Sequence, residues 1–429
     1  MTTDDPLWED VQRAIEAYCK ASQRPVFHPD NPMVRLHEPT FGAEEVGAVA
    51  RCMASTQVTM GPRVRAFEQA CGAAFGSNQA VSVNSGSSAN LLALAALCNG
   101  ETEGGLRPGD EVIVSALSWS TTVWPLVQHG LVPVIVDIDL HSLNIDPEAV
   151  EQAIGPKTRA VMPVHVYGNP CDMATLLRIC DAHDLILIED CCEAMGARYD
   201  GRPVGQFGRV GTYSFYFSHH ITTMEGGLCI SSDQDLGERM RILRAHGWLR
   251  DVEDPSRYAA DFPDVDPRFL FVNAGYNLRL TEPQGAMGLI QLGKLEGFVT
   301  ARRQVASWLR TALAPLEDRL RFQRETIGGI HSWFGFPIIL RDGAGPTVDD
   351  VRAYLQSRGV ESRPMLCGNI ARQPGMKLFP HRVSGPLDHA DRVMARGFSI
   401  ACHQDVSEAA VEYMAACLEQ SLNGSESCT

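Results

Sequence analysis

The sequence predicts an α/β fold with a doubly wound, mainly parallel sheet, followed by a smaller C-terminal α+β domain. Apolar runs typical of buried strands alternate with amphipathic helical segments between residues 79 and 190. Such alternation favours parallel crossover connections, which place helices on both faces of one sheet. The chain has 429 residues, of which 45% are hydrophobic, and this is enough apolar material for a large domain and a small one.

The expected strands and helices follow one another along the chain. Strands are expected at 79–84, 110–117, 132–139, 159–167 and 185–190, and the intervening helices at 87–98, 121–130, 147–155 and 173–184. From about residue 291 the pattern changes to a long helix and then to short strand and helix segments. We therefore expect an N-terminal helical arm at residues 1–35, a large domain at 36–290 and a small C-terminal domain at 291–429.

Composition and charge indicate which partners to expect. The net charge is -15 and no run of lysines and arginines occurs. The sequence therefore does not indicate the basic patch by which proteins bind nucleic acids or anionic membranes. No apolar stretch reaches the roughly 18 to 20 residues of a membrane span, and the acidic N-terminus lacks the apolar core of a secretory signal. The 13 cysteines are scattered, which in a reducing compartment favours free thiols. We expect a cytoplasmic protein that binds small molecules, without nucleic acid or membrane as partners.

A glycine and several serines stand between the first expected strand and its helix, in the segment "VSVNSGSSANLL". Gly86, Ser87 and Ser88 fall where this helix would begin. Backbone N–H groups and hydroxyls at a helix N-terminus, together with a glycine that allows close approach, can hold a phosphate group. Taken alone, the segment could also be a plain turn with a serine cap.

An aspartate, Asp190, ends the buried strand in "LILIEDCCEAMGA". A buried, ionised carboxylate needs a cationic partner, and the protonated nitrogen of a pyridine ring is one. Taken alone, this residue could equally cap a helix.

The segment "GTYSFYFSHHITTMEGGLCISS" is the most informative one. A strand that carries Ser214 runs into the pair His219-His220 and then into a Glu-Gly-Gly turn at residues 225–227. An isolated pair of histidines indicates a solvated loop or a casual metal contact. Here the pair follows the two segments above, and that context favours a role in the same site.

In their order and spacing, these three segments resemble the sugar aminotransferase family (DegT/DnrJ/EryC1/StrS type), whose members are fold-type I pyridoxal-phosphate enzymes that act on nucleotide-linked keto sugars. The resemblance runs from roughly Leu36 to the C-terminus and includes "FEQACGAAFG", "SALSWSTT", "PVHVYGNPCDM" and "GYNLRLTEPQGAMGLIQL". It implies the fold-type I aminotransferase fold, with the cofactor bound in the large domain at 36–290.

The lysine with which this family binds its cofactor covalently falls on His219. No lysine stands near this loop in sequence, because the chain contains only Lys20, Lys157, Lys294 and Lys377. A Schiff base between protein and cofactor is therefore not expected.

Histidine in place of this lysine is the mark of a small branch of the family, the sugar 3-dehydratases. The pattern "SHHI-T-MEGG" and the segments "RAHGW" and "SWFGF" resemble the GDP-4-keto-6-deoxy-D-mannose 3-dehydratases of the colitose pathway. A second group, the iron–sulfur CDP-sugar enzymes, shares "IEDCC", but its cysteine-rich loop is missing from "HGWLRDVEDPSRYAADFP". Cys191 and Cys192 alone cannot supply four thiolates, so buried packing is the preferred interpretation of this pair.

The resemblance implies a lyase that removes the C3 hydroxyl of a nucleotide-linked 4-keto-6-deoxy sugar. Its cofactor would be pyridoxamine 5'-phosphate, regenerated from pyridoxal 5'-phosphate with L-glutamate as amino donor. His219 would be the catalytic acid and base, since an unperturbed imidazole pKa near 6.5 suits both roles at neutral pH. No metal is expected.

The same resemblance implies binding roles for other residues. The cofactor would contact Gly86, Ser87, Ser88, Trp119, Asp190, Glu193, Ser214 and Asn277. Asp190 would meet the ring nitrogen, Trp119 would stack on the ring, and Asn277 would reach the phosphate of a neighbouring subunit, so a homodimer is expected. Substrate contacts are expected from His220, Arg250 and Arg363. His220 could instead orient His219 or merely pack, and Arg250 could form a surface ion pair.

Two other functions stay open on the sequence. The chain could be an aminotransferase that works without the usual lysine, or an inactive family member that serves as a subunit. The sequence also leaves the nucleotide open, and GDP, CDP and dTDP sugars are all compatible with it.

Overall fold

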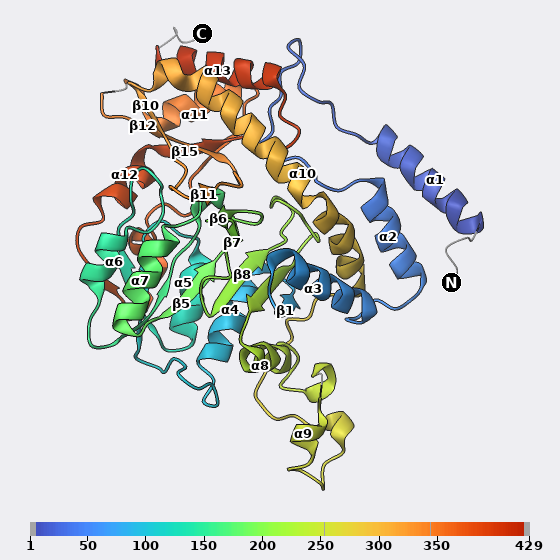
Figure 1. Cartoon of the computed structure of the whole chain (residues 1–429). Coiled ribbons are helices and arrows are strands. Elements are labelled where there is room, and N and C mark those ends of the chain that lie inside the picture. The colour runs from blue at the N-terminus through green and yellow to red at the C-terminus, as the bar shows by residue number, and fades with distance from the viewer. Residues whose placement is uncertain (1–5, 253, 344, 424–429) are drawn as a thin grey trace.

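The computed structural model describes residues 6–252, 254–343 and 345–423, and its largest element is an eight-stranded sheet (Figure 1). In spatial order the strands are β1 (Gln79–Val83), β9 (Gly227–Ser231), β8 (Val210–Ser214), β5 (Ile186–Asp190), β4 (Thr158–Met162), β2 (Glu111–Ser115), β3 (Val132–Val136) and β14 (Arg382–Val383). β9 is antiparallel to both neighbours, whereas the pairs from β8 to β14 are parallel. The predicted doubly wound, mainly parallel sheet is confirmed.

Helices cover both faces of this sheet because the side chains of each strand alternate between the faces. In β2, Val112 and Val114 pack on one face and Ile113 on the other. The first face is covered by α4 (Gly86–Leu97), α5 (Ser120–Gln128) and α8 (Gln234–Arg244). The second face is covered by α3 (Pro62–Phe75), α6 (Pro147–Ala153) and α7 (Met173–His183). The carboxyl ends of the parallel strands lie at one edge of the sheet, between the two helix layers. Ligands bind at this edge in sheets of this kind.

A second sheet is built from the C-terminal part of the chain. Its strands, all antiparallel to their neighbours, are β10 (Leu320–Phe322), β12 (Phe336–Leu340), β15 (Gly397–Ile400) and β13 (Ser362–Pro364). The helices packed with it are α11 (Val348–Ser357), α12 (Asp388–Arg396) and α13 (Glu408–Leu422). The helix α10 (Glu282–Leu313) is continuous over 32 residues and contributes to the cores beside both sheets. The predicted boundary between residues 290 and 291 falls inside this helix.

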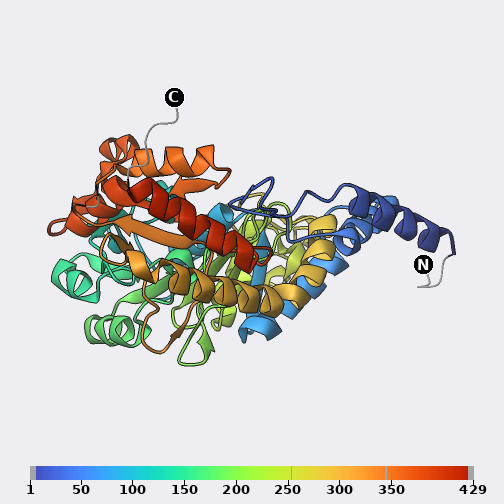
Figure 2. The ribbon, with the colours of Figure 1, turned by 90° about the horizontal axis from the view of Figure 1, so that it is seen from above.

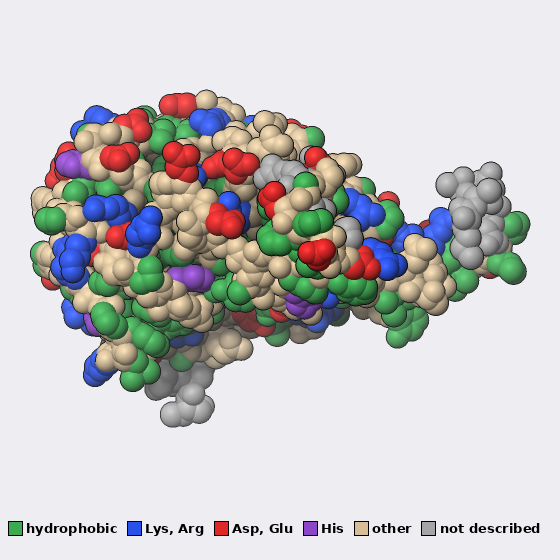
Figure 3. Space-filling view, turned by 90° about the horizontal axis from the view of Figure 1, so that it is seen from below, with side chains coloured by type: hydrophobic (Ala, Val, Ile, Leu, Met, Phe, Trp, Pro, Cys, Tyr) green, Lys and Arg blue, Asp and Glu red, His purple; other side chains and the backbone are tan. Residues whose placement is uncertain are grey.

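Two segments project from the body (Figure 1), and Figure 2 shows the first of them, with α1, extending to one side. α1 (Pro6–Ala21) contacts α2 (Ala43–Ala54) and has no buried residue. A second segment, described at residues 246–252 and 254–275, carries α9 (Ser256–Ala259) and leaves the body after α8 (Figure 1). Figure 3 shows acidic and basic side chains interspersed over one face of the molecule. Within the described ranges, every helix is too short or too polar to span a bilayer.

The remaining elements are short. A small third sheet is formed by β6 (Arg198–Tyr199), β7 (Arg202–Pro203) and β11 (Gly329–Ile330). Single 3-10 turns occur at η1 (Val166–Gly168), η2 (Leu249–Asp251), η3 (Pro267–Phe269), η4 (Ala314–Leu316), η5 (Ile370–Arg372) and η6 (Pro374–Leu378).

Candidate active site

Asp190 stands at the carboxyl end of the central strand β5 and is only 3% exposed. Its Oδ2 accepts hydrogen bonds from Asn90 Nδ2 (2.9 Å) and Thr122 Oγ1 (2.8 Å), and its Oδ1 accepts one from the backbone N–H of Cys192 (3.1 Å). Three donors hold the carboxylate in one orientation. No ion pair of Asp190 occurs within the described parts of the chain, so its negative charge is available to a bound cation.

The serine segment forms the N-terminus of α4, beside the end of β8. Ser85 caps the helix, and its Oγ accepts a hydrogen bond from the N–H of Ser88 (3.0 Å). A Cβ atom at position 86 would lie 2.5 Å from Cβ of Ser214, so only glycine fits here. A Cβ at position 227 would lie 2.3 Å from the carbonyl oxygen of Ser85, so Gly227 lets the histidine loop approach the same helix end. The structure therefore brings together the three segments that the sequence singled out.

His219 lies in the loop between β8 and β9, and its Nδ1 is 2.6 Å from the backbone oxygen of Cys192. A carbonyl oxygen only accepts hydrogen bonds, so Nδ1 carries the proton and Nε2 is the basic nitrogen. The ring packs against Phe334 with 4.9 Å between centroids and meets Tyr216 edge-on. The surroundings thus determine both the tautomer and the plane of this imidazole.

Burial and two nearby cations keep His219 neutral. Burial, with the charges of Arg363 and Arg302, lowers the pKa of His219 to about 4, although the hydrogen bond to Cys192 opposes this shift. Arg302 comes from α10 and is itself buried. Its Nη1 donates to three carbonyls, those of Trp333 (3.1 Å), Phe334 (3.2 Å) and Cys402 (3.0 Å). At neutral pH, His219 is therefore a base with a free lone pair on Nε2.

Two further histidines and an arginine lie close to the ring of Phe334. Its centroid lies 6.3 Å from that of His37 and 6.0 Å from that of His220, and the Arg363 guanidinium carbon lies 5.3 Å from it. Nη1 of Arg363 is also 3.3 Å from Nε2 of His37. Burial, together with the charge of Arg363, lowers the pKa of His37 to about 3, so its neutral ring accepts a hydrogen bond from the guanidinium. Arg363 is thus held beside His219 without a carboxylate partner among the described residues.

Glu193 lies next to this group, at the end of the turn that follows β5. Its Oε2 accepts a hydrogen bond from the N–H of Tyr167 (2.9 Å). Burial raises the pKa of Glu193 to about 7, and the charge of Asp190 adds to the rise, while Tyr167 and Arg363 counteract it. This carboxyl group can therefore hold or release a proton near neutral pH.

Trp119 and His220 differ in their access to the site. Trp119 is 54% exposed at the N-terminus of α5, two residues before Thr121, whose Oγ1 accepts a hydrogen bond from Ser87 (3.1 Å). Trp119 thus stands close in the chain to a residue that bonds to the serine segment. His220 is fully buried, and its Nε2 bonds to the carbonyl of Ser332 (3.0 Å). This burial favours orientation of His219 or packing, the alternatives to a substrate contact, and the substrate contact of His220 stays a prediction.

Asn277 and Arg250 lie at the surface of the chain. Asn277 is exposed and accepts a hydrogen bond from Nε of Arg279 (3.1 Å). Arg250 belongs to the projecting segment 246–275, and its guanidinium carbon lies 5.2 Å from the ring centroid of Trp248. Neither Asn277 nor Arg250 is bonded to His219 or Asp190 in this chain.

Sequence reasoning missed several residues that the fold brings to the site. Asn90 and Thr122 orient Asp190, and His37, Arg302 and Phe334 surround His219. A signal existed for Asn90, because it is the polar residue in the otherwise apolar stretch "ANLLALAAL" of α4. His37 had no comparable signal, since it reaches the site from the irregular segment that precedes α2.

The two adjacent cysteines face different surroundings. Cys191 packs in the core between β8, α3 and α10, as predicted for buried packing. Sγ of Cys192 would lie 3.1 Å from a Cβ at position 86, so Cys192 lines the serine segment. Its carbonyl is also the acceptor for His219.

A separate cluster of His165, Glu189 and Cys191 lies on the opposite face of β5. Glu189 accepts hydrogen bonds from three backbone N–H groups of residues 205–208, and His165 Nε2 is 3.2 Å from its Oε2. His165 Nδ1 accepts a hydrogen bond from the N–H of Cys171 (2.9 Å). These bonds tie the loop 205–208 to the central strand.

Acidification is expected to destabilise the protein between pH 6.5 and about 4. Burial holds the pKa of His219 and His403 at about 4 and that of His37 at about 3, against 6.5 for an ordinary histidine. Below pH 6.5 the unfolded chain binds protons that the folded protein does not, so the free energy of unfolding falls by on the order of a few kcal/mol as the pH falls through this window. Thermal unfolding followed by circular dichroism from pH 7.5 to pH 4.5 measures it.

A His403→Gln variant is the control for this effect. It lacks one of the three imidazoles and keeps His37 and His219, so its melting temperature should depend less steeply on pH. An unchanged melting temperature of the wild-type protein across the window would contradict the buried, neutral state of these histidines.

The chain is similar to known proteins over most of its length. The family model for the DegT/DnrJ/EryC1/StrS aminotransferase family matches residues 39–419. A GDP-4-keto-6-deoxy-D-mannose 3-dehydratase of Yersinia pseudotuberculosis is 39% identical over 378 residues, covering 87% of this chain and 95% of that protein. A dTDP-4-dehydro-2,6-dideoxy-D-glucose 3-dehydratase of Saccharopolyspora spinosa is 34% identical and covers 94% of this chain and 90% of that protein.

A solved structure is similar as well. The crystal structure of a GDP-4-keto-6-deoxymannose-3-dehydratase with a trapped PLP-glutamate geminal diamine superposes with a TM-score of 0.84 at 35% identity, covering 90% of this chain and 100% of that one. The fold-type I aminotransferase fold predicted from the sequence is thereby confirmed. With a family match over most of its length and relatives above 30% identity, this chain belongs to the DegT/DnrJ/EryC1/StrS aminotransferase family.

Proposed function

We propose that this protein is a pyridoxamine-phosphate-dependent 3-dehydratase of a nucleotide-linked 4-keto-6-deoxy sugar, which it converts into the 4-keto-3,6-dideoxy sugar. The observation that carries the proposal is His219, a neutral base with a free Nε2 at the position where the family has its lysine. The described lysines do not replace it. Lys294 is paired with Glu44 and Glu45, and Lys157 precedes β4 at the amino end of the sheet.

The site fits the cofactor without a covalent bond. Asp190 is a buried, oriented carboxylate that would hold a protonated pyridine nitrogen. Gly86, Ser87 and Ser88 at the start of α4, with Ser214 beside them, would hold the phosphate through N–H and hydroxyl donors. Trp119 is exposed and would cover the ring face.

Bound pyridoxamine phosphate supplies a primary amine for condensation with the C4 ketone and a conjugated ring that spreads negative charge. His219 moves protons at Nε2: as a neutral base it accepts one, and the imidazolium so formed can protonate the departing C3 hydroxyl. The Cys192 carbonyl stabilises that imidazolium through Nδ1–H. Glu193, whose pKa is raised to about 7, is the second group that can hold a proton here.

Regeneration of the amine form needs an amino donor, and Arg363 would bind a carboxylate of L-glutamate in this role. This guanidinium is oriented by His37 and Phe334 and forms no ion pair with a carboxylate of the described residues. It is suited to a carboxylate of L-glutamate because its planar donors match a carboxylate in a bidentate way. The same group could bind the diphosphate of the sugar nucleotide.

The protein is also proposed to act as a homodimer. Large apolar side chains are exposed on the projecting segment, where Phe269 is 62% and Phe271 is 53% exposed. A second copy would cover such a surface and would place Asn277 and Arg250 near the partner's site. Sedimentation velocity of the purified protein tests this, and a monomer at micromolar concentration would contradict it.

The reaction is tested with purified protein, pyridoxamine phosphate, L-glutamate and a panel of GDP-, CDP- and dTDP-linked 4-keto-6-deoxy sugars. We expect one nucleotide series to lose its C3 hydroxyl and release ammonia, as followed by mass spectrometry and an ammonia assay. A product that keeps nitrogen at C4 would show an aminotransferase instead. Absence of both cofactor binding and reaction with glutamate would indicate an inactive subunit.

A further inference from the structure

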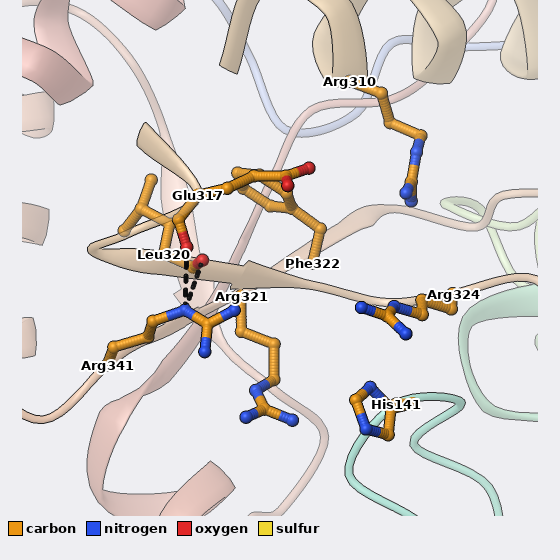
Figure 4. Close-up of a pocket in the computed structure, with 8 residues that line it drawn as sticks. All are labelled: His141, Arg310, Glu317, Leu320, Arg321, Phe322, Arg324 and Arg341. Carbon is orange, nitrogen blue, oxygen red and sulfur yellow. Dashed lines mark hydrogen bonds between the residues drawn. The ribbon is translucent and has the colours of Figure 1, made fainter. Parts of the chain in front are cut away.

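A pocket of about 300 Å³ lies beside β10, the edge strand of the small sheet, and shares no residue with the active site (Figure 4). It is lined by four arginines, Arg310, Arg321, Arg324 and Arg341, by His141 and by a single carboxylate, Glu317. The arginines come from α10, from β10 and from the residues that follow β10 and β12. His141 comes from the loop between β3 and α6, so the pocket lies where the two sheets meet.

These four arginines form no ion pair with a carboxylate of the described residues. Arg310 donates to the carbonyl of Gln323 (2.9 Å), and Arg341 donates to the carbonyls of Glu317 (2.8 Å) and Leu320 (3.1 Å), the latter two drawn as dashed lines in Figure 4. The neighbouring Asp342 is already engaged by Arg392 (2.9 Å). The chain has a net charge of -15, yet these four cations line one hollow without a carboxylate partner among the described residues.

The neighbouring arginines disfavour the charge of Arg321. Partial burial and the charges of Arg341, Arg392 and Arg324 lower the pKa of Arg321, and only Asp139 opposes them. Asp139 Oδ1 in turn accepts hydrogen bonds from two backbone N–H groups of its own loop. Like charges held together in a partly desolvated hollow cost stability unless an anion neutralises them.

We propose that this pocket binds a diphosphate group, either free or carried by a nucleoside. Guanidinium groups recognise phosphate oxygens bidentately, and several of them around one hollow suit a ligand with several charges. The volume is at the lower end of the range for small-molecule sites, about 300 to 1,000 Å³, and exceeds what a single ion needs. The assignment is independent of the proposed reaction, because none of the lining residues belongs to the active site.

Isothermal titration of the pyridoxamine-phosphate-loaded protein with inorganic pyrophosphate tests the proposal. We expect saturable binding that is at least tenfold weaker in the Arg321→Ser/Arg324→Ser variant and that weakens as the salt concentration rises. Arg178→Ser, which removes an exposed arginine on α7, is the matched control and should bind as the wild type does. GDP is titrated in parallel, and the part of its binding lost in the double variant shows whether a nucleoside is tolerated.

Three outcomes would overturn the proposal. Equal pyrophosphate binding in the wild type and the double variant would place the ligand elsewhere, for instance in the active site. Citrate binding as tight as that of pyrophosphate would reject the diphosphate class. A double variant that melts lower than the wild type without ligand would give these arginines a structural role, whereas relief of charge repulsion should leave its melting temperature equal or higher.

Discussion

Replacement of His219 by lysine is expected to abolish dehydration and to give the protein a visible absorbance band when pyridoxal phosphate is added. The lysine amine would stand where the family binds its cofactor covalently, and burial with the nearby charges of Arg363 and Arg302 favours its neutral, nucleophilic form. Loss of the imidazole base alone should lower turnover by about 10² to 10⁴. Absorbance spectra before and after borohydride reduction, together with the ammonia assay, measure both effects.

His219→Asn is the matched control for this experiment. It removes the base without adding an amine, so it should lose dehydration and stay without the covalent band. If His219→Lys dehydrates the sugar at the wild-type rate, His219 is not the base, and the proposed mechanism is wrong.

Replacement of Asp190 by asparagine is expected to weaken pyridoxamine phosphate binding by about 10- to 100-fold, since a hydrogen bond to a charged group contributes about 1.5 to 3 kcal/mol. Turnover should fall further, because the ring nitrogen would lose the anion that keeps it protonated. The substitution keeps the volume of the side chain, and its amide oxygen can still accept from Asn90 and Thr122. Its NH2 group cannot accept the hydrogen bond from the Cys192 N–H, so that bond is lost. Fluorescence titration with the cofactor and steady-state rates at saturating cofactor separate the two effects.

Thr122→Val is the control that leaves the charge in place. It removes one of the three hydrogen bonds to Asp190. It should therefore lower cofactor binding and turnover less than Asp190→Asn does. Equal effects of the two variants on turnover would mean that Asp190 acts through its position and not through its charge.

Much of the fold follows from local pattern. The five predicted strands recur as β1 to β5, because buried strands with alternating contacts leave a strong apolar signal. The sequence pattern did not indicate that α10 contributes to both cores, or that β14 pairs with β3 of the large sheet. Both depend on contacts between segments far apart in the chain, which periodicity does not record.

The chemistry of the site divides in the same way. The sequence by itself determined that the serine segment, Asp190 and His219 belong to one site, since a family pattern preserves residue types and spacing. Only the tertiary structure decided the state of His219: Cys192 sets its tautomer, and burial with Arg302 and Arg363 sets its pKa. A pKa depends on desolvation and on charges brought close in space, and these exist only once the chain has folded.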